Sequence, residues 1–258
     1  MPASTRYYRG QGKLYLYNRT AAGRPENGIF LGNVPELSTS INVENIEHAE
    51  SMTGQQLTDL RVNTKTQAML SATLENYSTE VLAIALRGTA STTNAGTVTA
   101  EPKAALKGRF IKLNRMNLTT FTSLTGIGGT PVYVNGTDYV VNLATGSIEI
   151  LSTGAIPDSV DGANNVAANY AFGAQESVAA MTAVSKNHYL IFEGLNTAEG
   201  NKPVVVEAYK VYFDPAAEES WINNGNEVSQ FQLEGEVLWD DLQATDDKFF
   251  KVIQTVRA

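Results

Sequence analysis

Alternation of apolar and polar residues with a period of two is the sequence feature that most constrains this fold. It runs through residues 36–44, 67–75 and 230–239. This period is typical of β-strands that have one face on a core and the other face in water. Residues 203–213 are apolar on both faces, which predicts a more central strand. The pattern therefore indicates a mainly β protein.

One helix is predicted within this β pattern, at about residues 78–87. Ser78 suits the N-cap position, and Tyr77 and Leu82 occupy the two positions of a hydrophobic staple. Gly88 stands where a left-handed residue commonly ends a helix. We expect this short helix to flank the strands.

Two segments without apolar periodicity divide the chain. Residues 45–66 are polar and are expected to form a long loop, and residues 89–100 are small and Thr-rich, as in a linker. Beyond them, Asn-Gly and Thr-Gly pairs separate short β runs. We therefore expect an inserted small β domain at 103–175. The flanking residues 1–102 and 176–258 would form one outer domain with a basic N-terminal arm at 1–12.

Composition argues against several classes of function. The 258 residues include no cysteine and only two histidines, His48 and His188, which excludes a disulfide framework, a thiolate metal site and a cysteine nucleophile. The glycine-rich segment 126–130 lacks the lysine of a phosphate-binding loop. No apolar run is long enough to span a membrane. We expect no enzymatic activity, no metal and no cofactor.

Charge is distributed unevenly along the chain, whose formal net charge is −8. Residues 1–35 are basic, whereas residues 176–258 are strongly acidic. In a polymer of identical subunits the basic end of one copy would attract the acidic end of the next, whereas in a monomer both are simply solvated. Glutamates also fall on the predicted water-facing sides of the strands. They belong either to an ordinary solvated sheet face or to the acidic inside of a ring, past which DNA would move without binding.

The order of these elements resembles the major tail tube protein of bacteriophages with long, flexible, non-contractile tails. Residues 28–88 are similar to the first half of that family, with a strand, a polar loop, a return strand and a short helix, and residues 192–240 are similar to its closing half. Residues 133–172 resemble a β insertion that some members carry. The resemblance implies a β-sandwich or barrel-like tail tube fold.

The same resemblance implies a structural virion protein without catalysis. Homohexameric rings would stack around a tape-measure protein into a tube that delivers the genome into the host. The tail terminator and tail-tip proteins would be further partners, and double-stranded DNA would pass without specific binding. The protein would be assembled in the host cytoplasm and reside in the virion tail, with no membrane partner and with the inserted domain on the outer surface.

Candidate functional residues follow from the strand pattern. We expect strands 36–44, 67–75, 203–213 and 228–239 to form the inner wall. Acidic residues predicted to face the lumen are Glu44, Glu75, Glu234 and Glu236. An arm predicted to dock on an acidic surface of the adjacent ring contains Arg6, Tyr7, Tyr8 and Arg9. A loop predicted to order against a neighbouring subunit contains Glu47, His48, Glu50, Asp59 and Arg61.

Two alternative functions remain open at this point. The β insertion would act as an adhesion module if Tyr133, Tyr139 and Tyr170 bound carbohydrate, as loop aromatics of many β-sandwich domains do. The same residues would also fit a packed core. Another virion component, such as the tube of a contractile tail or a head-tail connector ring, would share the strand pattern.

Overall fold

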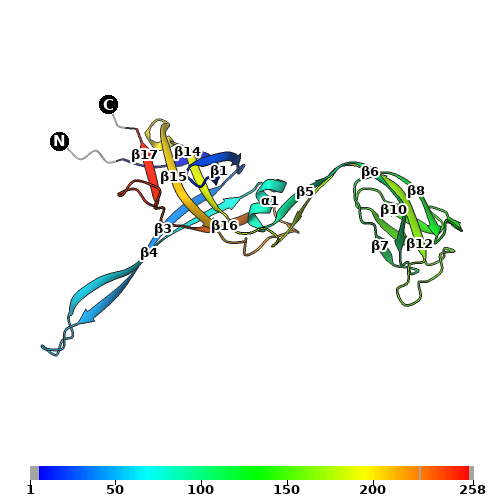
Figure 1. Ribbon diagram of the computed structural model, residues 1–258, viewed down its shortest axis with the longest axis horizontal. Helices are drawn as coiled ribbons and strands as arrows, with labels where there is room; N and C mark the ends of the chain where they lie inside the picture. Colours follow the sequence, from blue (N-terminus) through cyan, green and yellow to red (C-terminus); the bar gives the residue numbers. More distant parts are fainter. Residues whose placement is uncertain (1–5, 227, 256–258) are drawn as a thin grey trace. The chain divides into compact units, whose positions relative to one another are not determined.

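The computed structural model describes residues 6–226 and 228–255, and strands dominate it (Figure 1). Strands account for 52% of the residues and helix for 4%, which confirms the prediction of a mainly β protein. The strands form several sheets, and none of them closes into a barrel within the described part of a single chain. No helix among the described residues is long and apolar enough to cross a membrane.

The chain forms two compact units, residues 1–89 with 178–258 (unit 1) and residues 90–177 (unit 2). The prediction that residues 89–100 form a linker is wrong. This segment contributes β5 (Thr89–Thr93) and part of β6 (Gly96–Lys103), and β6 pairs with β12 (Val166–Phe172). Threonine and valine are good strand formers, so a segment that looks like a linker by composition is extended and paired here.

Unit 1 is built around an eight-stranded antiparallel sheet. Seven strands follow the order β2-β1-β14-β15-β16-β4-β3, and β17 pairs with β15 beside β16. The bounds are β1 (Gly10–Arg19), β2 (Pro25–Phe30), β3 (Glu36–Ala49), β4 (Thr58–Leu74), β14 (Asn187–Asn196), β15 (Lys202–Phe213), β16 (Phe231–Val237) and β17 (Phe250–Gln254). A short 3-10 helix, η1 (Thr197–Glu199), follows β14.

The core of unit 1 confirms the alternation at 67–75. Leu70 and Leu74 of β4 are buried, together with Leu233 of β16. Helix α1 (Thr79–Ala85) adds Val81 and Ala85 to this core. The predicted helix is therefore present. Its left-handed C-terminal residue is Arg87, with φ 47°, rather than Gly88.

The reason for glycine at position 88 differs from the one expected. A Cβ at Gly88 would lie 2.6 Å from the backbone oxygen of Ala179. Glycine is therefore needed there for a close approach of two backbone segments rather than for a left-handed conformation.

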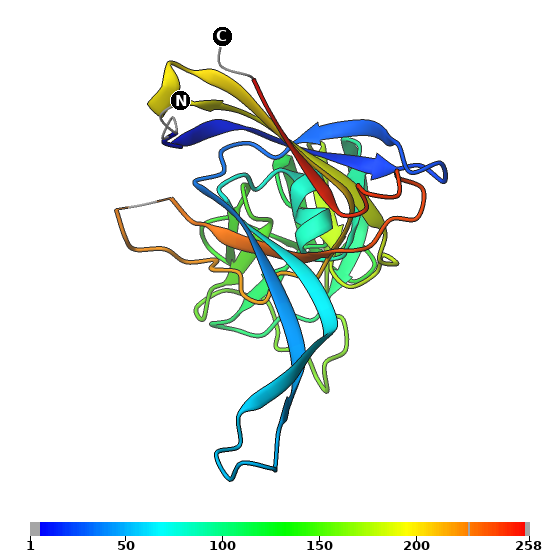
Figure 2. The ribbon, with the colours of Figure 1, turned by 90° about the vertical axis from the view of Figure 1, so that its left-hand side faces the viewer.

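Residues 45–66 do not form the predicted loop. They are the distal part of the β3–β4 hairpin, whose register continues to the pair of Ala49 with Thr58. Figure 2 shows this hairpin extending away from the other strands of unit 1. The prediction failed because cross-strand hydrogen bonds satisfy the backbone even where both faces of a hairpin are in water, so no apolar periodicity is required.

The alternation at 36–44 is likewise only partly realised. Leu37 packs against the core, but Ile41 and Val43, which were expected to be buried, are exposed. From Ile41 onward, β3 and β4 extend beyond the end of β16. The pairing of β4 with β16 ends at Ala68, and Ala68 lies opposite Ile41.

Unit 2 encloses a separate core between two sheets. A three-stranded sheet has the order β10-β11-β7 and a four-stranded sheet the order β6-β12-β8-β9, and β5 pairs with β13. The bounds are β7 (Phe110–Lys112), β8 (Leu118–Gly126), β9 (Val132–Tyr133), β10 (Tyr139–Asn142), β11 (Ser147–Ile150) and β13 (Gln175–Ala179). Leu124, Ile148 and Tyr170 are among its most deeply buried side chains.

Candidate functional site

A polar face covers β3, β4 and β16 on the side opposite the core. Residues in register on neighbouring strands point to the same side of a sheet, and the register aligns Glu36 with Thr73, Glu44 with Lys65 and Glu234 with Ser71. The polar face consists of Glu36, Ser38, Ser40, Asn42, Glu44, Lys65, Gln67, Met69, Ser71, Thr73, Gln232, Glu234 and Glu236. It carries four glutamates against one lysine, so it repels anions.

The four predicted lumen residues lie on or next to this face. Glu44 and Glu234 are exposed, and Glu236 accepts a hydrogen bond of 3.3 Å from Nε2 of Gln67. Glu75 follows the last residue of β4, where Nε2 of Gln230 donates to it at 2.8 Å. The fold therefore brings Glu44, Glu234 and Glu236 onto one surface and places Glu75 at its end.

An acidic hollow of about 630 Å³ lies at the end of the polar face. Glu36 and Glu234 line it from the sheet, and Asp214 and Glu218 line it from the segment after β15. The neighbouring Glu219 has both carboxylate oxygens buried without a hydrogen-bond partner in the described structure, and burial raises its pKa. This hollow extends the acidic character of the face beyond the strands.

The basic arm is described from Arg6 onward, and the rest of the predicted arm, residues 1–5, lies outside the described residues. Its backbone is bound to its own chain. The Arg9 amide donates to Oδ1 of Asn196 at 3.0 Å, and Nδ2 of Asn196 donates to the Tyr7 carbonyl at 2.8 Å. The side chains of Arg6, Tyr7, Tyr8 and Arg9 nevertheless remain exposed. Their aromatic rings and charges are thus free to meet a partner.

Four of the five predicted assembly residues pair with one another within the hairpin. Nδ1 of His48 lies 2.6 Å from Oδ1 of Asp59, and Nε of Arg61 lies 3.6 Å from Oε1 of Glu47. Both pairs are exposed, where ion pairs stabilise a protein by at most about 1 kcal/mol. These contacts therefore add little to the stability of the hairpin.

Glu50, the fifth of these residues, organises the turn at the hairpin tip. Its carboxylate accepts hydrogen bonds from the Thr53 hydroxyl, from the Thr53 amide at 2.9 Å and from the Met52 amide at 2.6 Å. The hydrogen bond from the Thr53 hydroxyl, followed by those from the two amides, lowers the pKa of Glu50. Glu50 therefore shapes the tip rather than presenting a free charge.

Exposed apolar side chains on the distal hairpin were missed by the sequence analysis. Ile46, Met52, Leu57, Leu60 and Val62 are all largely in water. Contiguous exposed apolar surface commonly marks an interaction site. A signal for it was present, because the apolar positions shift from odd numbers at Ile41 and Val43 to an even number at Ile46.

The carbohydrate-binding interpretation of the three tyrosines is wrong. Tyr133, Tyr139 and Tyr170 are buried in the core of unit 2. The hydroxyl of Tyr170 donates to Glu101, and burial followed by this hydrogen bond raises the pKa of Tyr170. None of the three rings is available to stack on a sugar, because each occupies the inward-facing position of its strand.

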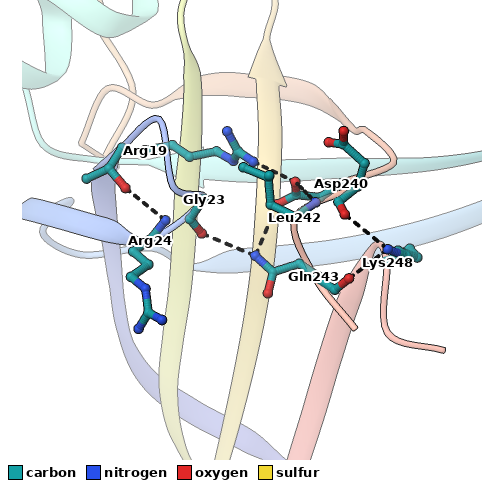
Figure 3. A network of polar contacts seen from close by, with 9 residues as sticks. Arg19, Gly23, Arg24, Asp240, Leu242, Gln243 and Lys248 are labelled. Atoms are coloured by element: carbon teal, nitrogen blue, oxygen red, sulfur yellow. Dashed lines mark hydrogen bonds and ion pairs between the residues drawn. The ribbon is translucent and has the colours of Figure 1, made fainter. Parts of the chain in front are cut away.

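A buried ion pair between Arg19 and Asp240 was also missed. Nη2 of Arg19 donates to Oδ1 of Asp240 at 2.5 Å (Figure 3). The exposed fractions of the two side chains are 11% and 0%. Nε2 of Gln243 donates both to Oδ2 of Asp240 and to the Gly23 carbonyl. Nζ of Lys248 donates to the Gln243 carbonyl at 2.6 Å. This network holds the segment that leads into β17, so it supports the fold rather than a reaction.

The pKa of Asp240 reflects this setting. Burial alone would raise the pKa of Asp240, but the hydrogen bonds from Gln243 and Arg19 outweigh burial and hold it below the ordinary value of 3.8.

No group of three or more His, Cys, Asp or Glu side chains that could hold a metal ion occurs among the described residues. The polar face, the arm and the distal hairpin therefore remain as the candidate functional surfaces.

Comparison with known proteins adds a family but no activity. None of the curated proteins matches the chain. Residues 7–253 match the family described as protein of unknown function UCP028589. Because this match covers nearly the whole sequence, the chain belongs to that family.

Proposed function

We propose that this protein is the tube subunit of a long, flexible bacteriophage tail, which forms stacked hexameric rings. The resemblance of residues 28–88 and 192–240 to major tail tube proteins motivates the proposal. The observation that carries it is the acidic polar face on β3, β4 and β16, at the border of a sheet whose outermost strand is β3.

Open strand edges supply the physical reason for assembly. The sheet order ends at β2 and at β3, and neither outer edge has a strand partner among the described residues. Unpaired edges are templates for further strand pairing, and closure into a ring removes them. In the proposed ring the polar faces of six copies form the inner wall of a tail tube fold, and its carboxylates repel the like-charged phosphates of passing DNA.

The remaining surfaces take roles outside the bore. The basic arm contacts the adjacent ring, the hairpin contacts a neighbouring subunit, and unit 2 occupies the outer surface. A tape-measure protein fills the tube during assembly, and terminator and tip proteins close its two ends. The protein acts as a structural component of the virion tail.

Electron microscopy of the purified protein at increasing concentration tests the proposal. We expect hollow tubes above a threshold concentration, and a protein that stays monomeric throughout would refute it. Smooth flexible tails and sheathed tails on the parent virions would distinguish the non-contractile from the contractile type.

Charge reversal tests the acidic bore separately. Virions carrying Glu234→Lys together with Glu236→Lys should form tubes but release their genome more slowly, because DNA would adhere to the wall. The matched control is Glu149→Lys, an exposed glutamate of β11 in unit 2. Genome release at the normal rate in the double variant would contradict an acidic bore.

A further inference from the structure

A pocket of about 230 Å³ lies at the edge of the unit 1 core, between the sheet and helix α1. Strands β1, β2 and β14 line it from the sheet, and Ala83 and Ile84 line it from the helix. The turn before β14 completes its wall. Pockets that take drug-sized ligands begin at roughly 300 Å³, so this pocket fits a smaller molecule.

The charged side chains that line this pocket are all basic. Arg87, Lys186 and His188 contribute to the lining, and no Asp or Glu does. Lys186 forms no ion pair within the described part of the chain. Burial, followed by the positive charge of Lys186, lowers the pKa of His188, so these two groups lie close enough to repel each other. The pocket is therefore a basic site in a chain whose net charge is −8.

Arg87 is held in place with part of its guanidinium group unused. Its Nη2 donates at 3.3 Å to the Tyr212 hydroxyl and to the Phe213 carbonyl. The Tyr212 hydroxyl in turn donates to Oγ of Ser185 at 3.0 Å, and Ser185 also lines the pocket. Nε and Nη1 of Arg87 have no hydrogen-bond partner among the described residues. A guanidinium group that is fixed by its neighbours and has donors to spare is preorganised for an anion.

Two acidic side chains near the pocket leave its charge largely uncompensated. Asp214 approaches Nη2 of Arg87 at 3.9 Å, but its side chain is 61% exposed. Exposed ion pairs of this kind are weak. Glu26 lies opposite Asn18 in register, is exposed and does not line the pocket. The basic groups therefore remain available to a ligand.

Apolar side chains line the same pocket. Leu16 and Ile29 contribute from the sheet, Ile84 from α1 and Phe213 from the end of β15. Such walls add affinity only for a ligand that buries apolar surface of its own. A bare inorganic anion would leave them uncovered.

We propose that this pocket binds a small organic carboxylate, a molecule with one carboxylate group on a short apolar body. Arg87 and Lys186 bind the carboxylate, and Leu16, Ile29 and Ile84 cover the apolar body. The acidic side chain of another copy has only a short stem before its carboxylate and would leave these walls uncovered, so the ligand is a free molecule. This assignment does not depend on tube assembly.

Titration of the natural chain with hexanoate, followed by amide chemical shifts, tests the assignment. Saturable shifts are expected at residues of the lining, such as Ala83, Gly88, Ser185 and Lys186. Hexanol has the apolar body without the charge, and inorganic phosphate has charge without the apolar body, so each should bind at least about tenfold more weakly. No saturable shift with hexanoate, or equal affinity for either comparison compound, would overturn the assignment.

Substitutions test where hexanoate binds. Lys186→Gln and Arg87→Gln should each weaken binding about tenfold, because each removes a charged donor. Ala83→Leu should abolish binding without changing the charge, because the larger side chain occupies part of the pocket. The matched control is Lys251→Gln, at an exposed position of β17 outside the pocket, which should leave the affinity unchanged.

The variants also define results that would contradict this site. Equal weakening by Lys186→Gln and Lys251→Gln would show only general charge attraction and overturn it, as would unchanged binding by Ala83→Leu. Melting temperatures show whether each variant is folded. Because Lys186 is exposed, its variant remains informative even if Arg87→Gln, which loses hydrogen bonds to its own chain, does not fold.

Assembly in saturating hexanoate distinguishes a free ligand from a side chain of another copy. The threshold concentration for tubes should not change if the ligand is a free molecule. A raised threshold would show that hexanoate displaces another copy, and it would overturn the assignment to a free molecule. A chain that binds hexanoate but never forms tubes would overturn the proposed function alone.

Discussion

The base and the distal part of the β3–β4 hairpin consist of the same two strands, yet different forces order them. At the base, Leu70 and Leu74 of β4 are buried and β16 pairs alongside. Beyond Ala68 no third strand pairs with the hairpin within the described part of the chain, and between residues 41 and 67 only Glu50 is buried. The base is held by a core, whereas the distal part is held by backbone pairing and short side-chain contacts.

The two parts of the hairpin therefore differ in how much they contribute to stability and in how much apolar surface they expose. Removing apolar surface from water is the dominant favourable contribution to folding, so the base should determine the stability of unit 1. The distal part leaves its apolar side chains in water, where they contribute little to folding and remain exposed. Five predictions test this separation.

The largest loss of stability is expected at the buried ion pair that supports the compact part of unit 1. Asp240→Asn leaves the charge of Arg19 buried without its partner, and breaking such a pair costs about 4 kcal/mol of unfolding free energy. Urea unfolding at pH 7 measures it. Asp241→Asn, at the exposed neighbouring position, is the matched control and should change stability by less than about 0.5 kcal/mol.

The pH dependence of the same pair has a definite sign. Because the pKa of Asp240 is held below 3.8 in the folded protein, its stabilisation is fully present above pH 4 and is lost as the pH falls through the folded pKa. Asp240→Asn should therefore flatten this part of the acid-unfolding curve. An unchanged curve would contradict the assignment of Asp240 as the charged partner of Arg19.

Two leucines of β4 compare the base with the distal part directly. Leu70→Ala should lower the free energy of unfolding by about 3 kcal/mol, because it leaves a cavity in the core. Leu60→Ala should change it by less than about 0.5 kcal/mol, because Leu60 is exposed. Equal losses in urea unfolding would show that the distal hairpin packs within its own chain.

Hydrogen exchange distinguishes the two parts without a substitution. In the monomer, amides of residues 45–49 and 58–63 should exchange faster than those of residues 68–74, because unsupported hairpins open locally. After assembly the distal amides should become strongly protected. Equal protection of the distal hairpin before and after assembly would contradict a role for it in subunit contact.

The smallest effect is expected at the hairpin tip. Glu50→Gln removes a charged acceptor from the Met52 and Thr53 amides, which should exchange faster while global stability remains unchanged. Because the pKa of Glu50 is lowered, the natural tip should loosen only as the pH falls through the folded pKa. Amide chemical shifts of residues 50–55 measure both changes. A fall in global stability would link the tip to the core.

Several parts of the fold could be predicted from local patterns. The alternation at 67–75 located β4, and apolar residues on both faces of 203–213 identified the central strand β15. The same reasoning failed at residues 45–66, because a hairpin with both faces in water has no burial pattern to detect. For Tyr133, Tyr139 and Tyr170 it left both sugar binding and a packed core open, and the structure shows the packed core.

The candidate surfaces were predictable to a similar degree. Glu234 and Glu236 were assigned to one side of their strand from alternation alone, and the register brings them together with Glu44. For the exposed apolar side chains of the distal hairpin, the shift of apolar positions from Val43 to Ile46 was a signal in the sequence. Their common side depends on a one-residue bulge at Thr64, which the sequence pattern does not show.

The mainly β character, the short helix and the acidic side of the strands follow from local sequence patterns, because each depends on residues a few positions apart. Two contacts between distant segments have no local pattern: the buried pair of Arg19 with Asp240, and the uncovered face that Ile46, Leu60 and Val62 share. Such contacts depend on strand order and register, which are fixed by packing and hydrogen bonding between distant segments.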